Sequence, residues 1–196
     1  MAVLTFSTGC ADEQSLSDKY PTQWTTCNAL FGAKNMESLR KILDSDDLKF
    51  SNPELSIDQL KNDLTKEAIG PYDKLKGFNE YDVCELSGNG SFHATATWAA
   101  DTLKAVQTYT AQWHQASTDV YVAKSSPNHL VFRCDIKSAT SGQQEQVLLE
   151  TRSWETTSNI FTEDFHQKLS VNLARALRDE LECTNKPDIP DDLQIG

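Results

Sequence analysis

Five widely spaced cysteines constrain this chain more than any other feature. They are Cys10, Cys27, Cys84, Cys134 and Cys183. No two of them form a C-x-x-C pair, so the spacing does not support a zinc knuckle or a thioredoxin-like motif. An odd count leaves one thiol over, and the remaining four cysteines can pair in three ways.

If Cys10 is set aside, the other four cysteines can form two bridges. We favour Cys27–Cys84 and Cys134–Cys183, because each pair then ties a helix end to a strand in the same half of the chain. Each bridge would close a loop of about 50 residues and contribute about 3–4 kcal/mol in the chain-entropy model. Disulfides are rare in a reducing cytoplasm, so an oxidised fold implies export. The alternative is a cytosolic protein with buried free thiols.

The N-terminus gives Cys10 a role outside the bridges. Residues 1–10 read MAVLTFSTGC, an apolar run that ends in small residues and a cysteine, and residues 11–15 are polar. This pattern is typical of the end of a bacterial lipoprotein signal, and we infer that the full signal begins upstream. We therefore expect a lipid on Cys10. The alternative is an ordinary N-terminal segment with an incidental cysteine.

Charge excludes several classes of partner. The chain has 196 residues, enough for one domain with a core, and its 29 acidic residues outnumber 18 basic ones to give a net charge of −11. Basic side chains are what bind phosphates, so nucleic acids and anionic lipid surfaces are disfavoured. The sequence has no apolar run of about 20 residues that could span a bilayer. We expect contact with a membrane only through the lipid anchor.

The domain begins with helix patterns. Residues 27–32 suggest a short helical turn that ends in glycine, and Asn35 could cap a helix whose apolar residues recur at helical spacing. A further helix starts at Ser56, where Ser56 and Gln59 form a capping-box pattern, and ends at Gly70.

The pattern then changes to period two. Residues 81–86 alternate, residues 87–90 form a strong turn, and residues 91–98 alternate again, which predicts an antiparallel hairpin. On the second strand the predicted inward-facing residues are Phe92, Ala94, Ala96 and Trp98.

The second half of the chain predicts further strands and a long helix. Residues 101–115 fit either a helix or a strand, and we predict a helix. Strands are expected at 120–123, 130–136 and 145–151. The last helix begins at the cap Thr162 and carries one continuous apolar stripe that ends near Cys183.

Helices, a meander of strands and a closing helix together predict an α+β fold. In this fold an antiparallel β-sheet has helices packed on one face and a long C-terminal helix. We divide the chain into a signal remnant and polar tether over residues 1–23, a single disulfide-stapled domain over 24–184, and a flexible acidic tail over 185–196.

The sequence contains no recognised catalytic or metal-binding motif. The histidines His93, His114, His129 and His166 are not spaced for a metal-binding helix. For His93 and His114 we expect a solvated or hydrogen-bonded side chain. The nucleophile elbow, the dinucleotide-binding motif, the P-loop and the EF-hand spacing do not occur. We therefore predict no catalytic residues, no metal and no cofactor.

Aromatic residues are the remaining candidates for a binding surface. Trp98 belongs to the inward-facing stripe of its strand, so it is expected in the core. Trp154 lies in the polar stretch 152–155, between a strand and the last helix. It is the residue that we choose as a candidate interface.

Several short motifs carry a family resemblance. They are the Gly9–Cys10 junction, the CNALF helix start at 27–31, the CEL strand start at 84–86 and the closing segment at 174–183. Together they resemble small actinobacterial lipoproteins, of the Streptomyces type, built on a domain of unknown function. The resemblance implies export, lipid anchoring and no established catalytic activity, and the only functional residues that it supplies are the cysteines.

These observations lead us to expect a non-catalytic lipoprotein on the outer face of the cell membrane. It would bind another envelope protein or a small ligand. The alternative is a secreted hydrolase with an unrecognised active site, which requires a histidine and a carboxylate to converge in a pocket.

Overall fold

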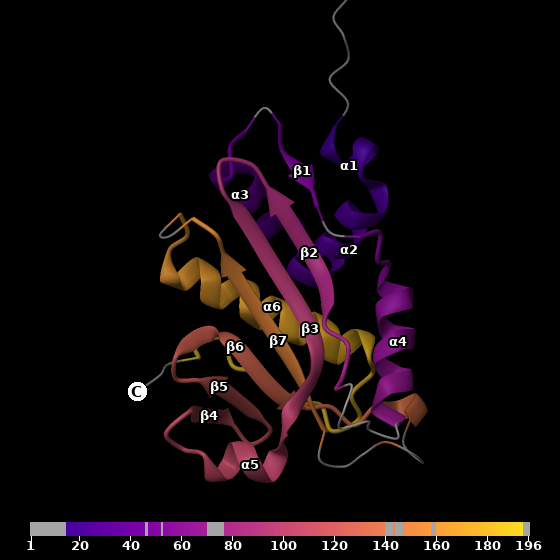
Figure 1. The fold of residues 1–196 in the computed structure, drawn as a ribbon, viewed down its shortest axis with the longest axis vertical. Helices are drawn as coiled ribbons and strands as arrows, with labels where there is room; N and C mark the ends of the chain where they lie inside the picture. The colour runs from indigo at the N-terminus through magenta and orange to yellow at the C-terminus, as the bar shows by residue number, and fades with distance from the viewer. Residues whose placement is uncertain are drawn as a thin grey trace, which may run out of the picture.

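A computed structural model describes residues 15–45, 47–51, 53–69, 77–139, 143, 147–157 and 160–193 (Figure 1). Along the chain the elements are α1 (Leu16–Lys19), α2 (Pro21–Phe31), α3 (Ala33–Ile42), β1 (Lys49–Phe50), α4 (Ile57–Ile69), β2 (Tyr81–Ser87), β3 (Ser91–Thr102), α5 (Leu103–Thr108), β4 (Trp113–Ser117), β5 (Val120–Ala123), β6 (Ser126–Arg133), η1 (Lys137–Ala139), β7 (Val147–Glu155) and α6 (Glu163–Glu180).

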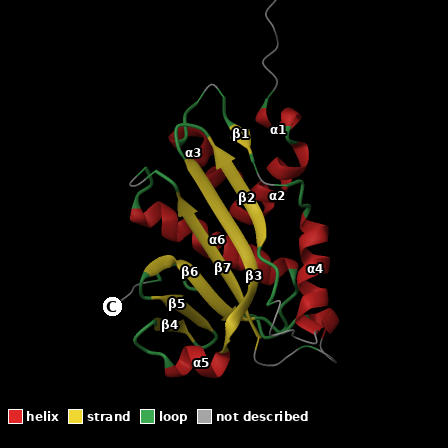
Figure 2. Ribbon diagram, viewed as in Figure 1, coloured by secondary structure: helices red, strands yellow, loops and turns green. Residues whose placement is uncertain are grey.

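A single antiparallel sheet organises the fold. Its seven strands lie in the order β1-β2-β3-β7-β6-β5-β4, and β7 pairs with both β3 and β6. In Figures 1 and 2 the strands pass in front of α6, so the viewer looks onto the opposite face of the sheet. The predicted α+β class, with an antiparallel sheet and a long C-terminal helix, is confirmed.

The main core lies between the sheet and the large helices. On β3, Phe92, Ala94, Ala96 and Trp98 are all buried, as their alternation predicts. The helix α6 begins at Thr162, whose side chain accepts a hydrogen bond from the Phe165 N–H. Its stripe of leucines is buried against the sheet and against α2. These leucines are Leu169, Leu173, Leu177 and Leu181.

A second, smaller core lies on the other face of the sheet. The helix α5 covers one end of that face, and Val106 is buried there with Tyr121, Val131 and Leu148. Because α5 is short, it covers only part of this face and leaves the rest to polar side chains.

Two disulfides tie the helices to the sheet, and they are the bridges that the cysteine pattern favours. Cys27 of α2 is bonded to Cys84 of β2, with Cα atoms 5.4 Å apart. Cys134 follows β6 and is bonded to Cys183 after α6, with Cα atoms 4.9 Å apart. Disulfides of this kind are typical of an oxidising, extracytoplasmic environment.

The prediction of one helix over residues 101–115 is wrong. The helix α5 ends at Thr108, where Tyr109 caps it, and the chain returns as β4. Pairing of Trp113 with Ala123 on β5 buries the indole, a gain that a continued helix would forgo.

Both predicted ends of the domain also need correction. The tether predicted over residues 1–23 is wrong for residues 15–23, because Ser15 caps α1 and Gln23 of α2 is buried. Residues 185–193 are not a flexible tail, because Ile189 and Leu193 are each 1% exposed. Cys10 lies outside the described residues.

Candidate functional site

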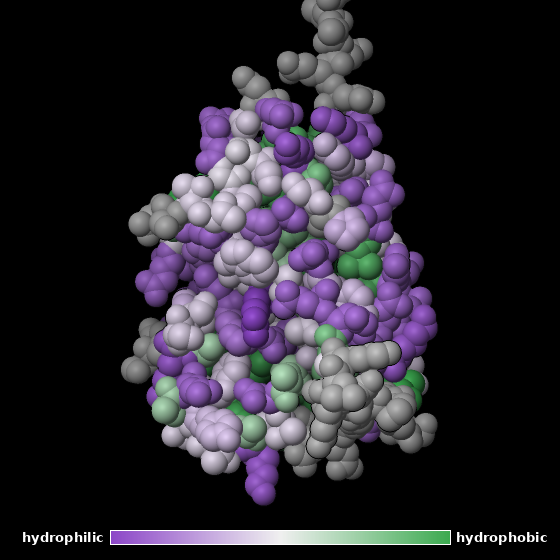
Figure 3. Space-filling model, viewed as in Figure 1, coloured by the Kyte–Doolittle hydropathy of each residue, from purple (hydrophilic) through white to green (hydrophobic). Residues whose placement is uncertain are grey.

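The candidate site is the part of the open sheet face that α5 does not cover. Residues directly opposite each other in a β-ladder share a face. His93 of β3 stands opposite Trp154 of β7. Arg152 of β7 stands opposite Thr95 on one side and His129 on the other. Figure 3 shows this side of the molecule, where hydrophilic and near-neutral residues predominate.

Trp154 is the most prominent side chain on this face. Its indole lies parallel to the imidazole of His93, with ring centroids 5.3 Å apart and ring planes 5° apart. The residue remains 39% exposed. His93 covers one side of the indole, so the exposed area of Trp154 lies away from that side. A large, partly open aromatic ring of restricted motion is typical of binding hot spots.

Polar neighbours fix the imidazole on which Trp154 rests. Nε2 of His93 lies 2.8 Å from Oγ of Ser91. Nδ1 lies 3.7 Å from Oε1 of Glu85 on the neighbouring strand. The Ser91 hydroxyl is also 2.6 Å from the hydroxyl of Thr156. These contacts restrict the orientation of the His93 imidazole on which the indole is stacked.

A second polar cluster adjoins the stack. Oε1 of Glu150 lies 2.9 Å from Nε2 of His129, and the Arg152 guanidinium bonds to the same carboxylate. The indole of Trp113 packs edge-on against His129, with ring centroids 5.0 Å apart. Arg152 remains half exposed, whereas the Glu150 side chain is only 8% exposed. The cluster places a fixed cation and an imidazole beside Trp154.

The pKa of the Glu150 carboxyl reflects this environment. Burial raises the pKa, but the hydrogen bond and charge of His129, together with Arg152, outweigh burial. The net pKa lies below the usual value of a glutamate. Glu150 is therefore an ionised anchor for His129 and Arg152 at neutral pH.

Glu85, His93 and Ser91 follow the order of a carboxylate–histidine–serine triad. Ser91, however, is only 8% exposed, and its hydroxyl contacts Thr156 as well as His93. Ser91 also lies at the start of β3, where Ser87 of β2 stands opposite it and the Thr156 N–H donates to its carbonyl. The geometry suits a structural network better than acyl transfer.

The histidines do not converge on one pocket. His93 and His129 each contact a different carboxylate on the open face. His166 of α6 lies 3.6 Å from Glu155 and packs against Phe161. Three histidines thus lie beside three separate carboxylates.

Sequence reasoning selected Trp154 but missed the residues around it. The four cysteines Cys27, Cys84, Cys134 and Cys183 serve as bridges. The missed residues are His93, His129, Glu150 and Arg152. One signal could have found part of the set, because Glu150, Arg152 and Trp154 are two residues apart and must share a face of one strand.

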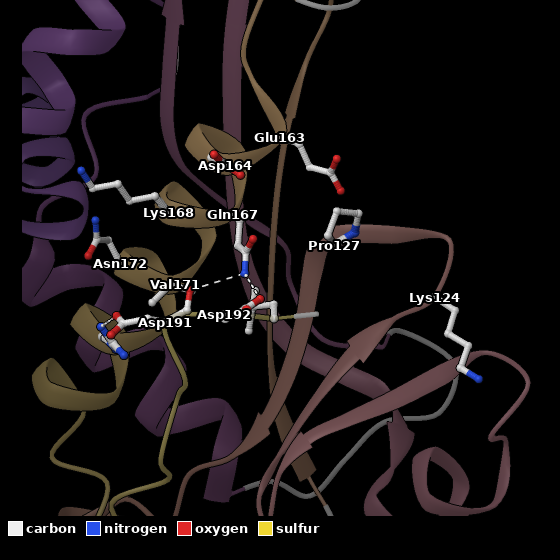
Figure 4. A pocket seen from close by; sticks show the side chains of 12 residues that line it. Lys124, Pro127, Glu163, Asp164, Gln167, Lys168, Val171, Asn172, Asp191 and Asp192 are labelled. Atoms are coloured by element: carbon white, nitrogen blue, oxygen red, sulfur yellow. Dashed lines mark hydrogen bonds and ion pairs between the residues drawn. The ribbon is translucent and has the colours of Figure 1, made fainter. Parts of the chain in front are cut away.

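A separate cleft of about 980 Å³ lies beside α6, the C-terminal segment and the turn between β5 and β6 (Figure 4). Arg175 of α6 pairs with Asp191 at 2.6 Å. The Gln167 amide donates to Asp192 at 3.2 Å. These bonds join the C-terminal segment to α6. We therefore interpret the cleft as a gap left where this segment packs against the helix.

Two further properties of the described residues bear on function. They include no group of three or more histidine, cysteine, aspartate or glutamate side chains placed to hold a metal ion. None of their helices has the length and apolar character needed to cross a membrane.

Comparison with known proteins identifies no relative of this chain. No family model matches the chain, and no curated protein or solved structure is significantly similar to it. The function is therefore inferred from the residues alone.

Proposed function

We propose that this chain is a non-catalytic binding module of the cell envelope, lipid-anchored through Cys10, and that it binds through the open sheet face around Trp154. We call that face the Trp154 surface. It comprises Glu85, His93, His129, Glu150, Arg152 and Trp154.

The exposed stack of Trp154 on His93 carries this proposal. On the other face of the sheet, Trp98 is only 2% exposed. Trp154, left 39% exposed near the end of the central strand β7, forgoes burial that Trp98 achieves. Aromatic and arginine side chains, here Trp154 and Arg152, are the residues most enriched at binding hot spots.

Photo-crosslinking in the native host tests the binding surface. The crosslinking amino acid p-benzoylphenylalanine replaces Asp82, an exposed residue opposite Thr95 on the same face. We expect a discrete adduct with a protein or a glycan, and we expect Trp154→Ala to abolish it. The same amino acid at Tyr109, 53% exposed and outside the Trp154 surface, is the control. Equal adducts from both positions, or none from Asp82, would contradict the proposal.

Intact mass measurement tests the anchor and the bridges. Protein exported from its full upstream start should carry a diacylglyceryl-type increment on the fragment that begins at Cys10. Reduction should add the mass of four hydrogen atoms, two for each of the two disulfides. An unmodified N-terminus with five free thiols would overturn export and anchoring together.

A secreted hydrolase is the second candidate, because Ser91, His93 and Glu85 are arranged in triad order. A fluorophosphonate probe distinguishes the two functions, since it labels activated serines. We expect no labelling of the native protein. Labelling of the native protein that is lost in the Ser91→Ala variant would establish the hydrolase and contradict the non-catalytic proposal.

A further inference from the structure

We infer that the ligand of the Trp154 surface is a neutral carbohydrate, a claim that rests on the proposed function of this surface. The ring stack, the surrounding polar groups and the charge each point to this class of ligand.

The indole of Trp154 is a suitable platform for a sugar ring. A pyranose presents C–H groups on one side, and their partly positive hydrogens are attracted to the negative face of an aromatic ring. His93 stacks on one side of the indole with ring planes 5° apart, so the partly exposed ring of Trp154 is already oriented. Such preorganisation lowers the entropy lost when a ligand binds.

The groups around the platform match the hydroxyls of a sugar. Each hydroxyl both donates and accepts, so a sugar needs acceptors and donors side by side. Glu85, whose side chain is 25% exposed, supplies carboxylate oxygens, and the half-exposed Arg152 supplies guanidinium N–H groups. His129 stands next to Arg152 across the β6–β7 pair. The half-exposed guanidinium of Arg152 is the one placed to reach a ligand on Trp154.

The charge of the chain disfavours an anionic ligand. Arg152 is neutralised by its contact with Glu150, and Glu85 adds a further negative charge beside His93. The whole chain carries −11, which repels phosphates and other anions. A neutral polyhydroxyl ligand does not meet this repulsion.

Nuclear magnetic resonance of the tryptophan indole N–H groups tests the inference on the whole domain. The probes are cellotetraose, chitotetraose, mannotetraose and galactotetraose, each titrated into nitrogen-15-labelled protein. We expect at least one to shift the Trp154 indole signal in a saturable manner. The Trp98 signal is the internal reference, because its buried N–H donates to the Leu64 carbonyl at 2.8 Å and should not move.

Variants then localise the binding by calorimetry with the same saccharide. Trp154→Ala should weaken affinity by about tenfold or more, whereas Trp154→Phe should retain part of it. Tyr109→Ala, which removes an exposed aromatic ring elsewhere, should leave affinity unchanged. A Trp154→Ala variant that binds like the native protein would overturn the inference.

The outcomes separate this inference from the proposed function. If no saccharide shifts the Trp154 signal but the crosslinker at Asp82 captures a protein in a Trp154-dependent manner, the ligand is a protein and the carbohydrate inference fails alone. If neither saccharide nor crosslink is found, both fail. Saturable binding that requires Trp154 supports both.

Discussion

Trp154 and His93 stack across the β3–β7 pair, 61 residues apart in sequence and 5.3 Å apart between ring centroids. The stack is a consequence of register, because these two residues stand directly opposite each other. A shift of either strand by one residue would turn one ring toward the helices and separate the pair. The Trp154 surface therefore exists only when the β3–β7 pairing is correct.

Trp98 and Trp154 should differ sharply in their effect on stability. Trp98 is 2% exposed and donates its indole N–H to the Leu64 carbonyl, so Trp98→Ala should destabilise the fold by about 3–5 kcal/mol. Trp154→Ala removes a partly exposed side chain and should cost about 1 kcal/mol or less. Urea denaturation of both variants measures the difference. Equal losses would mean that Trp154 is a core residue, in conflict with its proposed role.

The Cys27–Cys84 bridge should contribute strongly to stability. It closes a loop with a sequence separation of 57 residues, so the double variant Cys27→Ala/Cys84→Ala should lose about 3–4 kcal/mol in unfolding free energy. Thermal and urea unfolding without reductant provide the measurement. A double variant as stable as the native protein would contradict this contribution of the bridge.

Acid should weaken the fold in part through Glu150. Its pKa is lower in the folded protein, so its contribution is fully present above the unfolded pKa of about 4.3. That contribution is lost as pH falls through the folded-state pKa. Glu150→Gln should therefore lose less stability than the native protein between about pH 5 and pH 3. Glu54→Gln, at an exposed carboxylate, controls for the removal of one charge. An equal loss of unfolding free energy between pH 5 and pH 3 in the native and Glu150→Gln proteins would contradict this account.

The C-terminal segment should behave as part of the core. Ile189 is 1% exposed, so Ile189→Ala should cost about 2–4 kcal/mol of unfolding free energy. Ile69→Ala is the matched control, because Ile69 is 45% exposed and should cost far less. Hydrogen exchange of residues 185–193 gives an independent readout. Rapid exchange there, together with equal losses of unfolding free energy in the two variants, would show that residues 185–193 are a flexible tail.

Local patterns in the sequence were sufficient for much of the fold. The strand alternation at 91–98 gives the inward face of β3 directly, since side chains alternate with period two. The pattern of Ser56 and Gln59 marks the start of α4, where the Ser56 hydroxyl accepts from the Gln59 N–H at 3.2 Å. The bridges could be favoured because each joins neighbouring elements of one half of the chain.

Non-local packing explains what the sequence did not predict. Ile189 and Leu193 are isolated among prolines and aspartates, and their burial depends on a surface offered by the rest of the fold. Guanidinium bonds from Arg175 to the Ile189 carbonyl hold that segment in place. The site has the same origin, because His93 and Trp154 meet only through strand pairing. Periodicity gives the face of a residue but not its partner on another strand.

Footprinting of Trp154 by hydroxyl radicals, in intact cells and on purified protein, tests the central claim most directly. Tyr109 is the internal reference, because it is 53% exposed and lies outside the Trp154 surface. If this surface binds a ligand in the envelope, Trp154 oxidation should fall in cells relative to Tyr109, and both residues should react in the purified protein. An unchanged ratio of Trp154 to Tyr109 oxidation would show that the surface is uncovered in the cell and would contradict its role in binding.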